Sequence, residues 1–192
     1  VSSVALFGCA DKEEPAAKGK VEKPAAAEIA AGKAFAEREC KACHGVDGRG
    51  IAPAIPHLAA QRERYLIDSM KAYREGKRTH AALKEMAGRM SETDVRNVAA
   101  YYAGLPPVAG VSGKDVQPYS PYENGKALAA ACVKCHSEDG NSTTPGVPSL
   151  AGQQPRYLVV AIQEYLNKER KAAPMHALLP GRSIGVLYLL DQ

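Results

Sequence analysis

Three stretches in the first half of the chain carry apolar side chains every three or four positions, the spacing of one face of an α-helix. They are residues 29–39, 62–75 and 91–105. The members of these faces are, in order, Ala30, Ala34 and Phe35; Tyr65, Leu66, Ser69, Met70 and Tyr73; and Val95, Val98, Ala99, Tyr102 and Leu105. Ser91, with Asp94 three positions later, is a typical helix start. The pattern predicts an all-α fold.

The second half of the chain repeats the first at an offset of 92 positions. The identical pairs are His44/His136, Asp47/Asp139, Gly48/Gly140, Pro53/Pro145, Pro56/Pro148, Leu58/Leu150, Gln61/Gln153, Arg64/Arg156, Tyr65/Tyr157, Leu66/Leu158 and Tyr73/Tyr165. So many identities in one register indicate a duplicated module. We therefore predict a first module over residues 29–105 and a second over residues 124–192. Residues 106–123, which hold four prolines and no apolar period, are the predicted linker.

Each module contains the sequence Cys-x-x-Cys-His, at residues 40–44 and 132–136, and in the first module a glycine- and proline-rich loop follows at 45–56. Two thiols on one turn can add to the two vinyl groups of a haem, and the next histidine then faces the iron, so this is the signature of c-type haem attachment. A redox-active cysteine pair needs no histidine, and a zinc site built from both pairs leaves both histidines unexplained. We predict haem attachment at Cys40, Cys43, Cys132 and Cys135, with His44 and His136 as iron ligands.

The aromatic supply of the chain is small for two hydrophobic cores, because 192 residues include no tryptophan and two phenylalanines. Domains of about 70–80 residues have little core of their own and often need a staple. A covalently held porphyrin would supply the missing apolar mass. The predicted architecture is therefore two tandem helical domains, each wrapped around one covalently attached haem.

The sixth iron ligand decides the chemistry, since methionine gives an electron carrier whereas an open site could activate small molecules. Beyond Tyr165 the second module is shorter by three residues, which pairs Met86 with Met175, the only methionine after the second motif. Met70 aligns with an isoleucine and is expected in the core. We predict Met86 and Met175 as ligands. Met90 remains a competitor to Met86, and His176 a rival to Met175.

The N-terminal residues 1–28 suggest a membrane anchor. Leu-Phe-Gly-Cys at 6–9 resembles the end of a bacterial lipoprotein signal, whose cysteine is acylated. The alternative is the remnant of an ordinary signal peptide with a stray cysteine. Because an unpaired exposed thiol is unusual in an oxidising compartment, we expect a lipid at Cys9 and a flexible tether after it. This predicts a protein on the periplasmic side of a bacterial membrane. No stretch is long and apolar enough to span the bilayer.

The charge of the chain is +4 with a pI of about 8.8, but its basic residues are scattered rather than clustered with aromatic ones. A nucleic-acid partner is therefore not favoured. Residues 31–105 carry 13 basic and 9 acidic residues, whereas residues 106–192 carry 8 and 7. We therefore expect the first module to be the docking face for a redox partner.

With these motifs in place, the chain resembles the dihaem class I cytochromes c, most closely the cytochrome c4 family. The resemblance covers residues 31–192. It rests on residues 44–48 and 56–66, on Met86 ahead of residues 91–94, on residues 99–102, and on their counterparts in the second module. It implies that Pro56 and Pro148 lie beside the proximal histidines, that Leu58 and Leu150 pack on the haems, and that Arg64 and Arg156 meet propionates. A surface position is the alternative for both arginines. Residues 182–190 depart from the pattern, so the closing helix of the second module is expected to be short or differently packed.

The predicted function is electron transfer without a small-molecule substrate, in a bacterial respiratory or photosynthetic chain. The donor would be a quinol-oxidising complex or a dehydrogenase, and the acceptor a terminal oxidase or another redox protein. The protein would act as a free carrier or as a subunit of a larger membrane complex. The alternative is a dihaem enzyme such as a peroxidase. That reading needs one open iron and a pocket with acid–base residues, and no such constellation stands out in the sequence.

Overall fold

The computed structural model describes residues 24–109 and 121–179. Within these residues every regular element is helical and none is a strand, as predicted. No helix in this part of the chain is long and apolar enough to cross a bilayer. The predictions about Cys9, about most of the N-terminal tether and about the closing helix of the second module fall outside the described residues.

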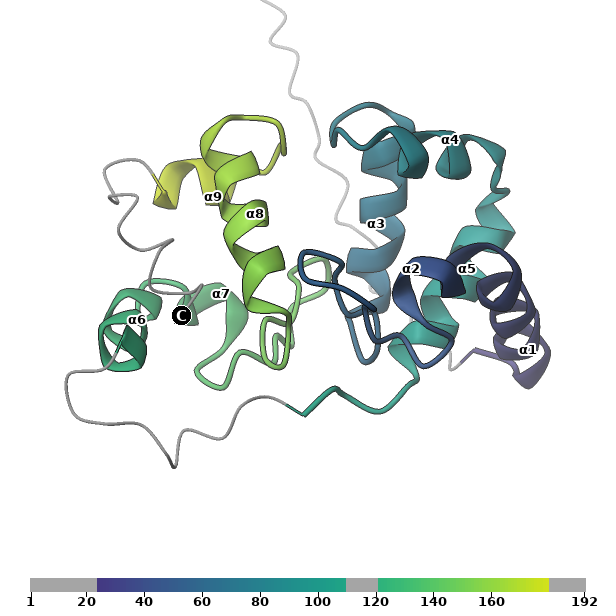
Figure 1. Ribbon diagram of the computed structural model, residues 1–192, viewed down its shortest axis with the longest axis horizontal. Coiled ribbons are helices and arrows are strands. Elements are labelled where there is room, and N and C mark those ends of the chain that lie inside the picture. Colours follow the sequence, from purple (N-terminus) through teal and green to yellow (C-terminus); the bar gives the residue numbers. More distant parts are fainter. Residues whose placement is uncertain (1–23, 110–120, 180–192) are drawn as a thin grey trace, which may run out of the picture.

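The helices follow one another as two similar series (Figure 1). The first module contains α1 (Ala26–Phe35), a π-helical turn η1 (Ala36–Cys40), α2 (Lys41–His44), α3 (Glu63–Arg74), α4 (Ala81–Arg89) and α5 (Glu92–Ala103). The second series consists of α6 (Pro121–Ala129), α7 (Val133–His136), α8 (Pro155–Leu166) and α9 (Ala173–Leu178). Helix α6 begins within the predicted linker.

The first module is built around the crossing of α1 and α5. The crossing is close because Gly32 lies against the backbone of α5, where an added Cβ would be 2.0 Å from the carbonyl oxygen of Asn97. The buried cluster beside it consists of Ala36, Cys40, Tyr101 and Tyr102. The first attachment cysteine is thus part of the core, and α1 leads directly into the haem motif through η1 and α2.

The three helices predicted from the apolar pattern are present, with small shifts at their ends. Helix α1 begins at Ala26, before the predicted start, and α3 lies within the predicted residues 62–75. Ser91 caps α5, with its hydroxyl accepting from the Asp94 N–H and the Asp94 carboxylate accepting from the Ser91 N–H. The pattern does not predict α4, which carries Met86.

The two modules meet through the loops that precede α3 and α8 (Figure 1). Gln61 hydrogen-bonds the backbone of Ser149, and Gln153 hydrogen-bonds the backbone of His57. The two contacts are equivalent in the repeat, because Gln153 lies 92 positions after Gln61 and Ser149 lies 92 positions after His57. Each module therefore presents the same loop to its neighbour, in the self-complementary manner of a two-fold interface.

Candidate functional site

Helix α2 places the first Cys-x-x-Cys-His motif on a single turn that ends at Gly45. The Nδ1 atom of His44 lies 3.0 Å from the carbonyl oxygen of Pro56, which leaves Nε2 as the nitrogen available to a metal. Burial lowers the pKa of His44, so the ring is neutral and suited to metal binding. Burial also raises the pKa of the Cys40 thiol to about 11, while Cys43 is exposed.

The second motif reproduces this geometry. Helix α7 ends at His136, which is 8% exposed, and its Nδ1 atom lies 2.9 Å from the carbonyl oxygen of Pro148. The predicted places of Pro56 and Pro148 beside the histidines therefore agree with the observed hydrogen bonds. In both modules the interacting proline lies 12 positions after the histidine.

A repeated glycine turn brings each proline back to its histidine. Gly48 and Gly140 have φ angles of +74° and +73°, a region that favours glycine. Their carbonyl oxygens accept from the N–H groups of Leu58 at 2.8 Å and Leu150 at 2.7 Å. A Cβ at Gly48 would lie 2.7 Å from the backbone nitrogen of Ala59, so the closeness of this turn also requires glycine.

The predicted ligand Met86 is half-buried on α4, whereas its competitor Met90 ends that helix and is 6% exposed. Both side chains line one hollow of about 460 Å³ beside Phe35 and Arg38. The carbonyl oxygen of Met90 accepts from the Arg74 guanidinium at 2.8 Å. Met90 is thus buried, whereas the side chain of Met86 is partly exposed.

Met175 occupies the matching place on the shorter helix α9. The residues before the two helices, His80 and Ala172, are 92 positions apart, but the residues that end them, Met90 and Leu179, are 89 apart. The three missing residues therefore lie inside the helix. In both modules the N–H of the terminating residue donates to the carbonyl of the methionine, at 3.2 Å from Met86 and 3.1 Å from Met175.

The rival His176 packs against an aromatic ring of its own module. Its ring meets Tyr165 edge-on with centroids 6.2 Å apart, and His80 meets Tyr73 in the same way at 6.3 Å. The two tyrosines are equivalent positions of the repeat. His80 directly precedes α4, whereas His176 lies within α9. Both nevertheless pack against the equivalent tyrosine of their own module.

The arginines predicted to meet propionates lie on exposed surfaces. Arg64 is 65% exposed and pairs with Asp68 at 2.9 Å on the next turn of α3, and Arg156 is exposed at the start of α8. The alternative reading of a surface position describes their environment.

Two other arginines, Arg78 and Arg170, are missed by the sequence reasoning although they are identical at the same offset of 92. Arg78 hydrogen-bonds the Tyr65 hydroxyl at 3.2 Å, and Arg170 hydrogen-bonds the Tyr157 hydroxyl at 3.3 Å. Each guanidinium also lies over the ring of that tyrosine, 5.2 Å and 5.4 Å from the centroid. The register that identified the other repeated residues would have identified this pair.

This arrangement gathers positive charge where α3 and α8 approach each other. Burial opposes ionisation of Tyr65, but the charges of Arg78 and Arg170 and hydrogen bonds from Arg78 and Tyr157 outweigh it and lower its pKa. Arg170 is 3% exposed and lies 2.5 Å from Glu164. Within the described residues, Arg78 has no carboxylate within ion-pair distance. A half-buried cation whose hydrogen-bond partner is a neutral hydroxyl, as Arg78 is, fits a carboxylate group of a bound cofactor.

The apolar faces of α3 and α8 fit the flat body of such a cofactor. Only Ser69 of α3 is buried, whereas Leu66 and, on α8, Leu158 are half-covered by other side chains. Leu58 and Leu150, predicted to pack on the haems, are also half-buried. These residues leave apolar surface partly uncovered in each module. The donor set and its surroundings therefore suit a haem in each half.

Comparisons with known proteins agree with this reading. The protein-family model described as "Cytochrome c" matches residues 29–105 and 122–182. Cytochrome c4 of Pseudomonas aeruginosa is 36% identical over 151 residues, which cover 76% of this chain and 75% of that protein. The thiosulfate dehydrogenase electron acceptor of Thiomonas intermedia is 29% identical over 147 residues, covering 71% of this chain and 66% of the relative.

The fold also matches a solved structure. The crystal structure of reduced recombinant cytochrome c4 from Pseudomonas stutzeri superposes with a TM-score of 0.74, covering 85% of this chain and 95% of that one at 24% identity. The matches confirm the predicted all-helical, two-module fold. Together with the two cysteine pairs, they confirm the prediction of two covalently attached c-type haems.

Proposed function

Since this chain belongs to the cytochrome c family, within its cytochrome c4 group, we propose that it relays electrons between redox proteins in a bacterial respiratory or photosynthetic chain. Like these relatives, it is an electron carrier and not an enzyme. Each haem, when bound, supplies an iron that cycles between the ferrous and ferric states. The protein supplies attachment, axial ligands and a controlled environment.

The proposed ligand sets are His44 with Met86 and His136 with Met175. The observation that carries this proposal is the repeated geometry of the two modules. In each module the histidine Nδ1 lies within hydrogen-bond distance of a proline carbonyl, and a half-buried methionine lies four residues before the residue that ends its helix. Two filled axial positions favour outer-sphere electron transfer over binding of small molecules. We further propose that Arg78 and Arg170, rather than Arg64 and Arg156, receive haem propionates.

The proposed electron donor is a dehydrogenase or a quinol-oxidising complex, and the proposed acceptor is a terminal oxidase or another redox protein. A relative is an electron acceptor of thiosulfate dehydrogenase, which supports a dehydrogenase as donor. The contact would be small and transient, as in other electron-transfer encounters. Near the first motif, Ile51 is 65% exposed and its N–H donates to the carbonyl of Cys43, which places an apolar docking residue beside the attachment turn.

We propose a periplasmic location with a lipid at Cys9. The support is the Leu-Phe-Gly-Cys sequence at 6–9 and the odd cysteine count of five. Mass spectrometry of the N-terminal peptide from native membranes tests this point. A diacylglyceryl mass on Cys9 is expected, and an unmodified cysteine would contradict the anchor.

Separate replacement of Met86 and Met90 by leucine tests the ligand set of the first haem. Leucine keeps the apolar volume but cannot bind iron through sulfur. In the ferric holoprotein, Met86→Leu should abolish one of the two methionine-to-iron charge-transfer bands and give one high-spin iron. Met90→Leu is the matched control in the same hollow and should retain both bands. Loss of a band in Met90→Leu alone would assign the ligand to Met90.

A further inference from the structure

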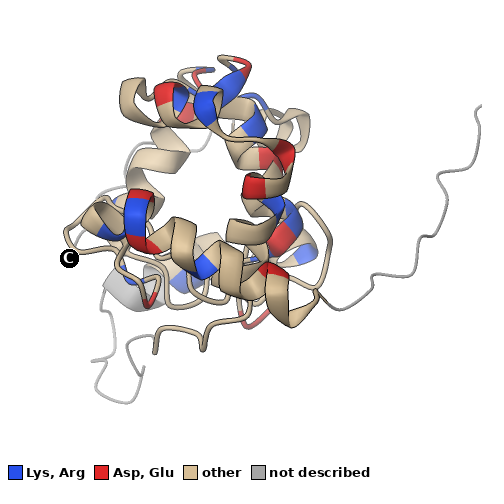
Figure 2. Cartoon of the chain, turned by 90° about the vertical axis from the view of Figure 1, so that its right-hand side faces the viewer, with Lys and Arg blue, Asp and Glu red and all other residues tan. Residues whose placement is uncertain are grey.

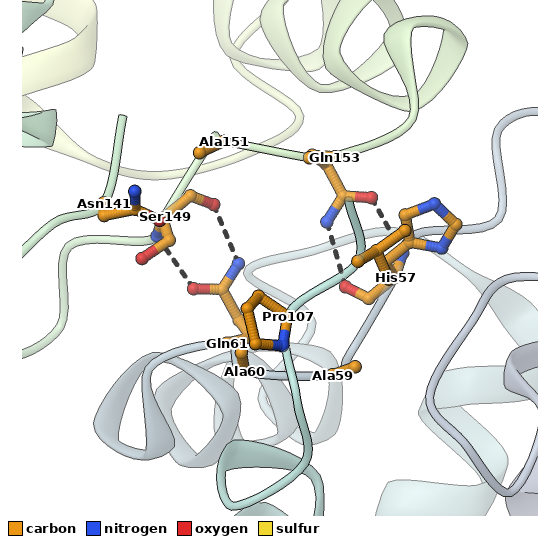
Figure 3. A pocket seen from close by; sticks show the side chains of 11 residues that line it. His57, Ala59, Ala60, Gln61, Pro107, Asn141, Ser149, Ala151 and Gln153 are labelled. Carbon is orange, nitrogen blue, oxygen red and sulfur yellow. Dashed lines mark hydrogen bonds between the residues drawn. The ribbon is translucent and has the colours of Figure 1, made fainter. Parts of the chain in front are cut away.

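One peptide unit links the proximal histidine of the first module to the second module. The carbonyl oxygen of Pro56 lies 3.0 Å from His44 Nδ1. The N–H of the same peptide unit belongs to His57 and donates to the side-chain oxygen of Gln153 at 2.7 Å. The Gln153 amide nitrogen in turn donates to the His57 carbonyl at 2.9 Å, which fixes the orientation of the amide (Figure 3).

The opposite module contains the same chain of hydrogen bonds. His136 Nδ1 lies 2.9 Å from the Pro148 carbonyl, and the N–H of that peptide unit belongs to Ser149. Ser149 donates to the side-chain oxygen of Gln61 at 2.8 Å, and the Gln61 amide nitrogen donates to the Ser149 carbonyl at 2.9 Å (Figure 3). Gln61 is 6% exposed, so this contact is shielded from water.

Hydrogen bonds at the two ends of a peptide unit reinforce each other. When the N–H donates to an acceptor, electron density moves to the carbonyl oxygen, which then accepts more strongly from the histidine N–H. A stronger hydrogen bond at Nδ1 makes the imidazole a more basic ligand. A more basic ligand stabilises ferric iron and lowers the reduction potential. The direction of the effect therefore follows from the donor order in the chain.

We propose that Gln61 and Gln153 are positioning residues that each lower the reduction potential of the haem held by the opposite module. Gln153 acts on the haem attached at Cys40 and Cys43, and Gln61 acts on the haem attached at Cys132 and Cys135. The proposal rests on the proposed axial roles of His44 and His136. It makes the interface between the modules part of the control of electron flow, because opening the interface would raise both potentials.

The neighbouring Gln154 separates this effect from simple contact between modules. Its side chain crosses the same interface and donates to the carbonyls of Gly50 at 3.0 Å and Ile55 at 2.7 Å. It does not bond the N–H of His57, which Gln153 occupies. Replacing Gln154 therefore removes a contact between the modules while the acceptor of the peptide unit that faces His44 stays in place.

The experiment compares Gln61→Met, Gln153→Met and the control Gln154→Met in the full-length holoprotein. Methionine keeps the length of the side chain and removes the amide. The two reduction potentials are measured by spectroelectrochemical titration, and each haem is assigned to its module by NMR of its axial histidine and methionine. The Nδ1–H resonance of each axial histidine provides a second readout that does not depend on electron-transfer activity.

Gln153→Met should raise the potential of the first-module haem more than that of the second, and weaken the His44 Nδ1–H hydrogen bond. Gln61→Met should show the reverse pattern, and Gln154→Met neither. Equal shifts of both haems, a shift confined to the mutated module, or an equal shift in Gln154→Met would overturn the proposal. Because each variant concerns a different haem, either one suffices if the other does not fold. Failure of the axial assignment is distinguishable, since the unmodified protein would then lack histidine–methionine signatures.

Discussion

Two tyrosine hydroxyls of α5 hold the chain directly after His44, the proposed ligand of the first iron. Tyr102 donates to the carbonyl of Gly45 at 3.0 Å, and Tyr101 donates to the carbonyl of Val46 at 2.8 Å. Tyr102 is fully buried, and its backbone carbonyl accepts from Ala60. A single residue thus joins the closing helix to both ends of the loop that carries Pro56.

Tyr102→Phe should lower the free energy of unfolding by about 1–2 kcal/mol, because it leaves the half-buried Gly45 carbonyl without its donor, the hydroxyl of a fully buried side chain. Denaturant titration of the holoprotein measures the loss. Tyr101→Phe removes the same group from a residue that is 7% exposed, where water can replace it, and should cost less. An equal or smaller loss for Tyr102→Phe would contradict the role assigned to its burial.

At the level of single residues, the sequence predicts features that follow from the spacing of residues along the chain or from the register of the repeat. The Cys-x-x-Cys-His motifs and the pairing of Met86 with Met175 are of this kind. The cross-module roles of Gln61 and Gln153 are not, although both were recognised as repeated. A repeat shows that two residues are equivalent, but their partners at residues 57 and 149 lie in the other module and follow only from the arrangement of the modules.

The elements were predicted best where they are long and amphipathic, as in α3 and α5. Helix α4 was missed because it is short, carries a broken apolar pattern and begins after His80 instead of a typical capping residue. Gly32 reads as a helix-weakening residue in the sequence, yet it is buried at the crossing of α1 and α5. Only the packing of the two helices explains its presence there.

Gly32→Ala should destabilise the first module by about 1–3 kcal/mol, because the added Cβ would meet the Asn97 carbonyl at 2.0 Å and push the helices apart. Thermal and denaturant unfolding measure the effect. Gly88→Ala in α4 is the matched control, since nothing lies within 4 Å of its Cβ and alanine favours helix by up to about 1 kcal/mol. A neutral Gly32→Ala variant would show that the crossing tolerates separation.

At the scale of the whole molecule, the duplication was predictable but the mutual placement of the modules was not. Their contact is made by amide side chains and backbone groups of two equivalent loops, and no apolar pattern marks it. On the side of the molecule that Figure 2 shows, acidic and basic residues are interspersed along the described helices. The docking face expected on the first module from its small excess of basic residues stays a prediction.

A redox titration of the intact holoprotein, followed by its optical spectrum, tests whether the chain is a two-haem electron carrier. We expect each chain to take up two electrons, and both ferric haems to be low-spin with a methionine-to-iron charge-transfer band. We also expect neither ferrous haem to bind carbon monoxide while the methionine ligands stay in place. One high-spin iron, or carbon monoxide binding at one haem of the unmodified protein, would contradict the assignment of a two-haem electron carrier.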